Sequence, residues 1–170
     1  PCSGYWNGRQ LISRGGQVIA APAWFIAGWP ATPMDGELWA GRGRFSHAQS
    51  TTAQVVANDA AWRQMQFMVF DMPAAPGSFD QRLTLLQRTV SAIAQPWVQA
   101  VEQRKLSSES ELQQWLTHVV NSGGEGLMLH KASAPDRSGR SDDLLKLKPF
   151  DDAEAQVIGY KPGRGQWQGM

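Results

Sequence analysis

Hydrophobic residues recur at two spacings along the chain, and the wider spacing predicts two amphipathic helices. Ser78 with Gln81 has the spacing of a helix-capping box, and apolar residues follow on one helical face: Leu83, Leu86, Val90 and Ile93. Ser108 with Glu111 repeats this signal before a second apolar face: Leu112, Trp115, Leu116, Val119 and Val120. Gly123 then supplies a helix stop.

Shorter apolar runs predict strands. Asn7-Gly8 lies between two such runs and predicts a hairpin, because both residues tolerate positive φ. Other strands are expected at residues 34–40, 64–72, 97–101, 125–130, 144–148 and 154–160. Since strands and helices mix without a regular βαβ alternation, the predicted class is α+β with largely antiparallel sheets.

The remaining segments predict minor elements. A short helix should begin at Pro22, and a weak helix is expected near residues 50–58. The stretch 132–143 contains Pro135, Gly139 and several charges, which predicts an exposed and mobile loop.

Composition narrows the class of protein. With 170 residues, 42% apolar and 18% charged, the chain is long and apolar enough for a globular domain with a sizeable core. No run approaches the roughly 18 apolar residues that a membrane span needs, so no membrane partner is expected. A single cysteine, Cys2, excludes an internal disulfide framework and a cysteine-rich zinc site. The three histidines, His47, His118 and His130, show no metal-ligand spacing.

The net charge of +1 hides an uneven distribution. No Asp or Glu precedes Asp35, whereas Arg9 and Arg14 lie before it and Arg42 and Arg44 soon follow. This pattern permits a nucleic-acid-binding face, although many solvated surfaces are similarly basic.

Two lysines are the strongest candidates for binding an anion. Lys146 and Lys148 are two residues apart in a predicted strand, so both ammonium groups can point to one face. The alternative is a solvated pair on an edge strand. The flanking residues predict a mostly buried segment instead: Leu144, Leu145, Leu147 and Phe150.

Two carboxylates stand out for a related reason. Glu37 lies inside an otherwise buried strand, where an unpaired charge is costly. Glu125 follows a glycine pair and starts an apolar strand, so it could project into a cleft, or it could simply be exposed. Asp35 is expected to have a structural role at the start of its strand.

Four segments carry a family resemblance: Asp35-Gly36-Glu37-Leu38, Phe67-Met68-Val69-Phe70-Asp71, Glu125-Gly126-Leu127-Met128 and Leu144-Leu145-Lys146-Leu147-Lys148-Pro149-Phe150. In this order they resemble the motifs of covalent nucleotidyltransferases, and their amino-acid sequences are most similar to those of small bacterial ATP-dependent DNA ligases. The resemblance runs from about Gly4 to Met170. It implies an ATP-grasp-like nucleotidyltransferase (adenylation) domain at 1–150 and the start of a truncated OB-fold domain at 151–170. The family's nucleophile motif, Lys-x-Asp-Gly-x-Arg, does not occur in the chain.

The resemblance also implies roles for the charged candidates. Lys146 and Lys148 would contact the α-phosphate of ATP or AMP. Glu125 would bind the metal, and Glu37 would organise the nucleotide and its Mg²⁺.

An aromatic residue and an arginine complete the implied site. Phe70 would stack on adenine, with ordinary core packing as the alternative, and the neighbouring Phe67 leaves the register of the strand open. Arg14, in Ile12-Ser13-Arg14, would bind the 5′-phosphate of a nick, with a surface arginine as the alternative.

The implied function is that of an ATP-dependent DNA ligase acting in DNA replication, repair or recombination. The complete enzyme would form lysyl-AMP, transfer AMP to the 5′-phosphate of nicked double-stranded DNA, and seal the nick with Mg²⁺. This chain alone is expected not to adenylylate itself, because Lys105, Lys131 and Lys161 lie in unrelated contexts. The alternatives are a non-catalytic nucleotide- or DNA-binding remnant and an RNA ligase or capping-type enzyme. The resemblance favours a monomer in the periplasm, with the cytoplasm as the alternative.

Overall fold

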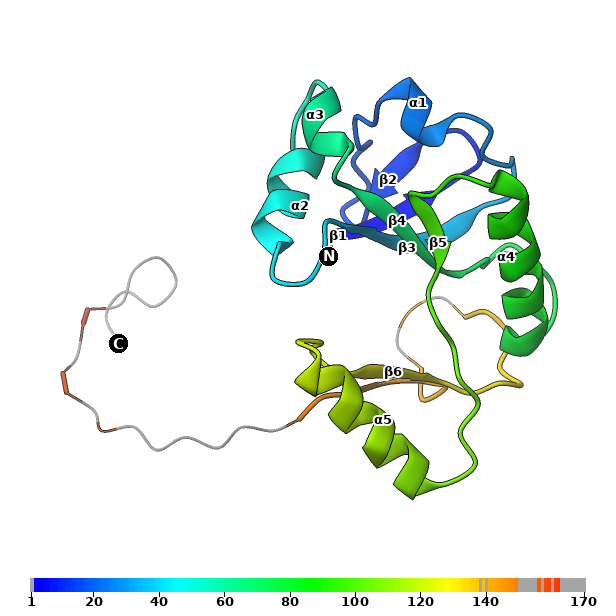
Figure 1. Ribbon diagram of the computed structural model, residues 1–170, viewed down its shortest axis with the longest axis vertical. Coiled ribbons are helices and arrows are strands. Elements are labelled where there is room, and N and C mark those ends of the chain that lie inside the picture. The colour runs from blue at the N-terminus through cyan, green and yellow to red at the C-terminus, as the bar shows by residue number, and fades with distance from the viewer. Residues whose placement is uncertain are drawn as a thin grey trace.

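Two β-sheets of unequal size build the protein. The structure is a computed structural model and describes residues 2–137, 139, 141–149, 156, 158–159 and 161–162 (Figure 1). The larger sheet has the order β2-β1-β3-β4-β5. Its strands are β1 (Cys2–Trp6), β2 (Leu11–Ser13), β3 (Met34–Trp39), β4 (Gln66–Asp71) and β5 (Val98–Ala100). Its pairs are antiparallel except for β4 with β5, which are parallel.

The smaller sheet is a two-stranded antiparallel ribbon of β6 (Leu127–His130) and β7 (Leu144–Leu147). The helices are α1 (Ala23–Ile26), α2 (Phe45–Thr52), α3 (Asp59–Trp62), α4 (Phe79–Ile93) and α5 (Glu109–Asn121). Figure 1 shows the ribbon and α5 together below the five-stranded sheet, with α1 and α3 at the opposite end of the molecule. The predicted α+β class is confirmed, and no helix among the described residues is long and apolar enough to cross a membrane.

The core lies on one face of the five-stranded sheet. Burial alternates along β3: Met34, Gly36 and Leu38 are buried, and the residues between them are half-buried. Successive side chains of a strand point to opposite faces of the sheet, so one face of β3 lies in the core. Phe67 of β4 is fully buried and stacks on Trp29 with ring centroids 4.9 Å apart. The opposite face carries Glu37, which is half-buried.

The predicted hairpin at Asn7-Gly8 is confirmed. The connection between β1 and β2 is longer than a two-residue turn, and the side-chain Oδ1 of Asn7 accepts hydrogen bonds from the backbone N–H groups of Arg9 and Gln10 at 2.9 and 2.8 Å. Gly8 has φ 93°, so it supplies the left-handed position on its own.

Both capping signals mark true helix starts. At α4, Ser78 and Gln81 form the predicted capping box. At α5, Ser108 accepts from the Glu111 N–H at 3.2 Å, as expected. In a capping box the Glu111 carboxylate would accept from the backbone N–H of Ser108. Here it accepts instead from the backbone N–H of the preceding residue, Ser107, at 2.8 Å.

The weak helix predicted at residues 50–58 is misplaced. The helix in this region is α2, which ends at Thr52, and the following residues Val55 and Val56 are 92% and 79% exposed. These two β-branched residues have no apolar surface to pack against, and β-branching itself disfavours a helix. Asn58 instead caps α3 by accepting from the Ala61 N–H at 3.0 Å.

The exposure predicted for the loop at 132–143 is confirmed for residues 132–133, 135–137, 139 and 142 and is wrong for Ala134. Ala134 is only 7% exposed, and Pro135 forms an isolated β-bridge with Ser78. The strand predicted at 154–160 and the OB-fold segment at 151–170 lie mostly outside the described residues.

Candidate nucleotide-binding site

The lysine pair lies on and just after β7. Lys146 is opposite Met128 of β6, and Lys148 follows the last residue of the strand. Leu144 and Leu145 are 44% and 52% exposed, so the prediction that this segment is mostly buried is wrong. The physical reason is that no third strand of the described residues pairs with this ribbon, so its leucines are covered only in part.

Lys148 and Glu125 form an ion pair at the end of the ribbon. The Lys148 Nζ donates to the Glu125 Oε2 at 2.7 Å. This hydrogen bond raises the pKa of Lys148 and lowers the pKa of Glu125. The ion pair therefore favours the charged form of both groups.

Gly126 makes this arrangement possible. It has φ 143°, and a Cβ built on it would lie 2.1 Å from the backbone oxygen of Leu147. The backbone before β6 therefore packs directly on the end of β7, which brings Glu125 to Lys148.

Glu37 faces this ribbon from the larger sheet. It pairs with Ser3 of β1 and Met68 of β4, and it is half-buried. Burial raises the pKa of Glu37, the negative charge of Glu125 raises it further, and the positive charge of Lys146 opposes both. The fold thus brings residues from β3, the start of β6, and β7 within electrostatic reach of one another.

The register of β4 separates its two phenylalanines. Phe67 belongs to the core, whereas Phe70 is half-buried at an irregularity where the pairing steps from Gly36–Val69 to Asp35–Asp71. Of the two rings, only Phe70 is available to a ligand.

Asp35 is a titratable group whose behaviour the sequence did not reveal. Burial raises its pKa to about 6, with the charge of its cross-strand partner Asp71 adding to the rise and a hydrogen bond from the Gly36 backbone opposing it. The backbone hydrogen bond agrees with the structural role expected for this residue. The high pKa depends mainly on burial of the carboxyl group and to a smaller extent on Asp71, and no local sequence pattern identifies either cause.

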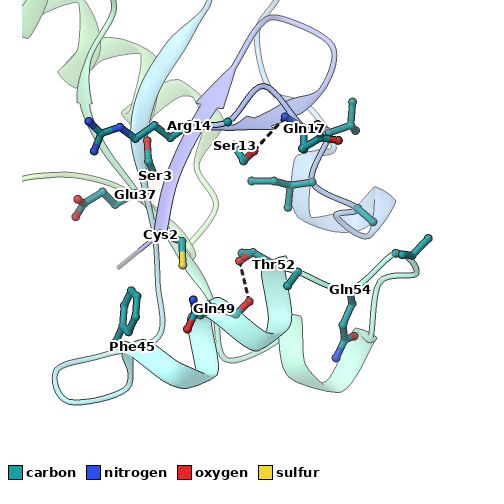
Figure 2. A pocket seen from close by; sticks show the side chains of 16 residues that line it. Cys2, Ser3, Ser13, Arg14, Gln17, Glu37, Phe45, Gln49, Thr52 and Gln54 are labelled. Carbon is teal, nitrogen blue, oxygen red and sulfur yellow. Dashed lines mark hydrogen bonds between the residues drawn. The ribbon is translucent and has the colours of Figure 1, made fainter. Parts of the chain in front are cut away.

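Arg14 lies in a separate groove, which has a volume of about 790 Å³. In Figure 2 its side chain extends toward the end of the groove where Ser3 and Glu37 lie. The opposite wall comes from α2, which contributes Phe45 and Gln49. These α2 residues were not predicted from the sequence, although the basic loop just before α2 was a signal for them.

Two carboxylates are candidates for holding a magnesium ion, but they do not enclose one. No group of three or more His, Cys, Asp or Glu side chains that could hold a metal occurs within the described part of the chain. Mg²⁺ usually keeps several waters and binds one or two carboxylates together with substrate phosphates. Glu37 and Glu125 supply such a pair, and Glu125 raises the pKa of Glu37, so a cation there would relieve their repulsion.

Comparison with known proteins gives a consistent family. Residues 24–148 match the domain family described as "ATP dependent DNA ligase domain". A DNA ligase of Haemophilus influenzae is 34% identical over 167 residues, which covers 98% of this chain and 62% of that protein.

Solved structures agree. A structure from a structure–function analysis of Lig E DNA ligases, concerned with DNA binding by a minimal scaffold, superposes with TM-score 0.90 at 43% identity. That match covers 99% of this chain and 66% of the other. A Chlorella virus DNA ligase–adenylate structure shares the fold, with TM-score 0.72 at 21% identity over 95% of this chain and 62% of that one. The chain thus spans about two thirds of the length of these relatives. It belongs to the ATP-dependent DNA ligase family.

Proposed function

We propose that this chain supplies the adenylation domain, at 1–150, of an ATP-dependent DNA ligase, with 151–170 beginning an OB-fold domain. The complete enzyme would seal nicks in double-stranded DNA through lysyl-AMP and DNA-adenylate intermediates, and would act as a monomer. The observation that carries the proposal is the convergence of Lys146, Lys148 and Glu125 on one ribbon that faces Glu37.

The residues of the chain have distinct tasks in this proposal. Lys146 and Lys148 bind the α-phosphate and stabilise the charge that develops when it is transferred. Glu125 currently neutralises Lys148, so an incoming phosphate competes with a carboxylate for that ammonium group. Phe70 holds the adenine ring on the half-buried side of β4.

Glu37 and Glu125 would hold the Mg²⁺, which neutralises phosphate charge when it is bound. Arg14, in the neighbouring groove, would bind the 5′-phosphate of the nick. Because Glu37 also lines that groove, it connects the nucleotide site with the DNA site.

Replacing either lysine tests the proposal in an enzyme completed with the nucleophile motif and the OB-fold domain. Lys146→Ala and Lys148→Ala should each slow single-turnover sealing of a pre-adenylylated nick by about 10²–10³-fold, because each removes a contact to the transferring phosphate. Lys161→Ala, outside the four motifs, is the matched control and should seal at the parent rate. Sealing at the parent rate by both β7 variants would show that these lysines are surface charges.

The runner-up is a remnant that binds nucleotide or DNA without chemistry. It is favoured by the absence of a Lys-x-Asp-Gly context in these residues. We propose on this ground that the 170-residue chain does not adenylylate itself.

A further inference from the structure

A buried ion pair ends the strand that carries Phe70. Arg82, in the first turn of α4, is 3% exposed and is the only charged residue among the fully buried ones that the structure describes. Its Nε and Nη2 donate to the two carboxylate oxygens of Asp71 at 2.8 and 3.0 Å. Asp71 is the last residue of β4 and directly follows Phe70.

The same guanidinium reaches the segment that leaves the smaller sheet. Its Nη1 donates to the backbone oxygens of Gly77 and Ala134 at 3.1 and 3.3 Å. The Ala134 oxygen also accepts from the Phe79 N–H at 2.8 Å. Arg82 therefore joins the end of β4, the start of α4 and the loop after β6.

An aromatic stack covers this junction. The ring of Phe79 stacks on His130, the last residue of β6, with centroids 4.1 Å apart and planes 14° apart. The Arg82 guanidinium lies 5.7 Å from the same phenylalanine ring. Figure 1 shows the start of α4 beside the loop that follows β6, so the junction lies at one end of the space between the sheets.

Other links between the two sheets are weaker. Residues 101–108 connect them without secondary structure, and the Lys105–Asp80 ion pair is exposed. On the opposite side, Arg42 approaches Gly124 so closely that a Cβ there would lie 2.6 Å from its Nη1, but Arg42 is also exposed. Arg82 is thus the buried side-chain connection, at a junction where the backbone N–H groups of Phe79 and Asp80 also donate to the Ala134 and Ala132 oxygens at 2.8 and 3.1 Å.

We propose that Arg82 is a positioning residue that sets the geometry between the two sheets. Through Asp71 it fixes the end of β4 beside Phe70, and through Ala134 it fixes the loop that leads into β7 and its two lysines. The distance between the adenine-binding and phosphate-binding groups follows from these two contacts. The link to nucleotide binding rests on the proposed function, whereas the mechanical role does not.

The planar, forked guanidinium is what this role requires. It donates in three directions at once, to a carboxylate and to two backbone oxygens, and a lysine ammonium cannot reproduce that geometry. A buried charged pair adds little net stability compared with apolar residues of similar volume, and the role proposed for this pair is to select one arrangement of the chain.

Distances between spin labels test the mechanical role in the full 170-residue chain. Cys2→Ser removes the only cysteine, and Gln87→Cys and Thr117→Cys place labels on exposed positions of α4 and α5. The parent should give one narrow distance distribution. Arg82→Lys and Asp71→Asn should broaden this distribution. Each disrupts the two-bond ion pair between Arg82 and Asp71 without removing much side-chain volume. Arg63→Met, which removes an exposed arginine paired with Asp59, should leave it unchanged.

Two results would overturn the mechanical role. One is a narrow distribution in both Arg82→Lys and Asp71→Asn while each still melts cooperatively. The other is the loss of cooperative melting in both, which would make Arg82 a residue for folding rather than for placing one sheet against the other.

Calorimetric titration with ATP tests the link to the nucleotide. Arg82→Lys should weaken ATP binding about tenfold or more, a usual size for coupling between linked sites, while Arg63→Met should bind as the parent does. Unchanged affinity in Arg82→Lys would overturn the link. If the parent itself fails to bind ATP while the spin-label distances respond, the proposed function fails and the positioning role stands.

Discussion

At the scale of single residues, Asp35 has the most informative ionisation in the molecule. Its pKa is raised to about 6, mainly because the carboxyl group is buried, and Asp71 lies opposite it. An unfolded aspartate has a pKa of about 3.9. Between these two values the folded protein binds more protons at this group than the unfolded chain, so stability falls as the pH rises through that window.

We therefore expect Asp35→Asn to stabilise the protein at neutral pH. The gain in the free energy of unfolding should be about 1–2 kcal/mol at pH 7, after allowance for the part of the group that solvent screens, and should vanish near pH 4. Urea unfolding of parent and variant at both pH values measures it. Asp59→Asn, at an exposed site, serves as the control, and an equal gain at both pH values would contradict the role of ionisation.

Single residues also show which features of the site could be predicted from the sequence and which could not. The spacing of Lys146 and Lys148 is a local pattern, but β7 ends at Leu147, so only Lys146 lies in the strand that the spacing assumed. The choice between Phe67 and Phe70 could not be predicted, because it depends on the pairing of β4 with β3 and on the irregularity between them. Arg82 gave no sequence signal, since its partners Asp71 and Ala134 lie 11 and 52 residues away.

At the scale of elements, the β6–β7 ribbon depends on one glycine. Gly126→Ala places a Cβ against the Leu147 oxygen at a position with φ 143°. Strain and overpacking together should cost about 3–5 kcal/mol and should separate Glu125 from Lys148.

A second glycine provides the control for this prediction. Gly43 also has positive φ, 71°, but a Cβ added there would meet nothing within 4 Å, so Gly43→Ala should cost only about 1–2 kcal/mol. Thermal and urea unfolding of both variants compares them. Equal losses would mean that contact with β7 has no part in the effect.

Elements with their own local signals were predicted well. The capping box of α4 and the stop at Gly123 both act within a few residues, and both were found. The failures at 50–58 and at Ala134 have a different origin. The helix that overlaps residues 50–58 ends at Thr52, because the β-branched Val55 and Val56 that follow are exposed and do not favour a helix. Ala134 is buried by a contact distant in sequence, since its oxygen accepts from the Phe79 N–H.

At the scale of the whole molecule, the two sheets carry complementary parts of the proposed site. Glu37 and Phe70 lie on the larger sheet, and Lys146, Lys148 and Glu125 lie on or beside the β6–β7 ribbon. None of the five lysines in the chain stands in a Lys-x-Asp-Gly context. We therefore expect no covalent AMP on this chain after incubation with α-labelled ATP and Mg²⁺.

The same incubation with an enzyme that contains the nucleophile motif is the positive control. A labelled adduct on the 170-residue chain would contradict the prediction and would point to one of its own lysines as a nucleophile. Peptide mapping would then identify that lysine.

The indole rings give the two halves of the molecule different optical properties. Trp6 and Trp29 lie 5.2 Å apart, and Trp24 and Trp97 lie 5.1 Å apart, all packed with the five-stranded sheet. Trp115 instead belongs to α5, where it stacks on His118 beneath the Arg104 guanidinium, 3.7 Å from the ring. Among the described residues, neighbouring indole rings therefore report on the half that contains the five-stranded sheet, and Trp115 alone reports on the other. The chain carries built-in spectroscopic labels for following each half without any added dye.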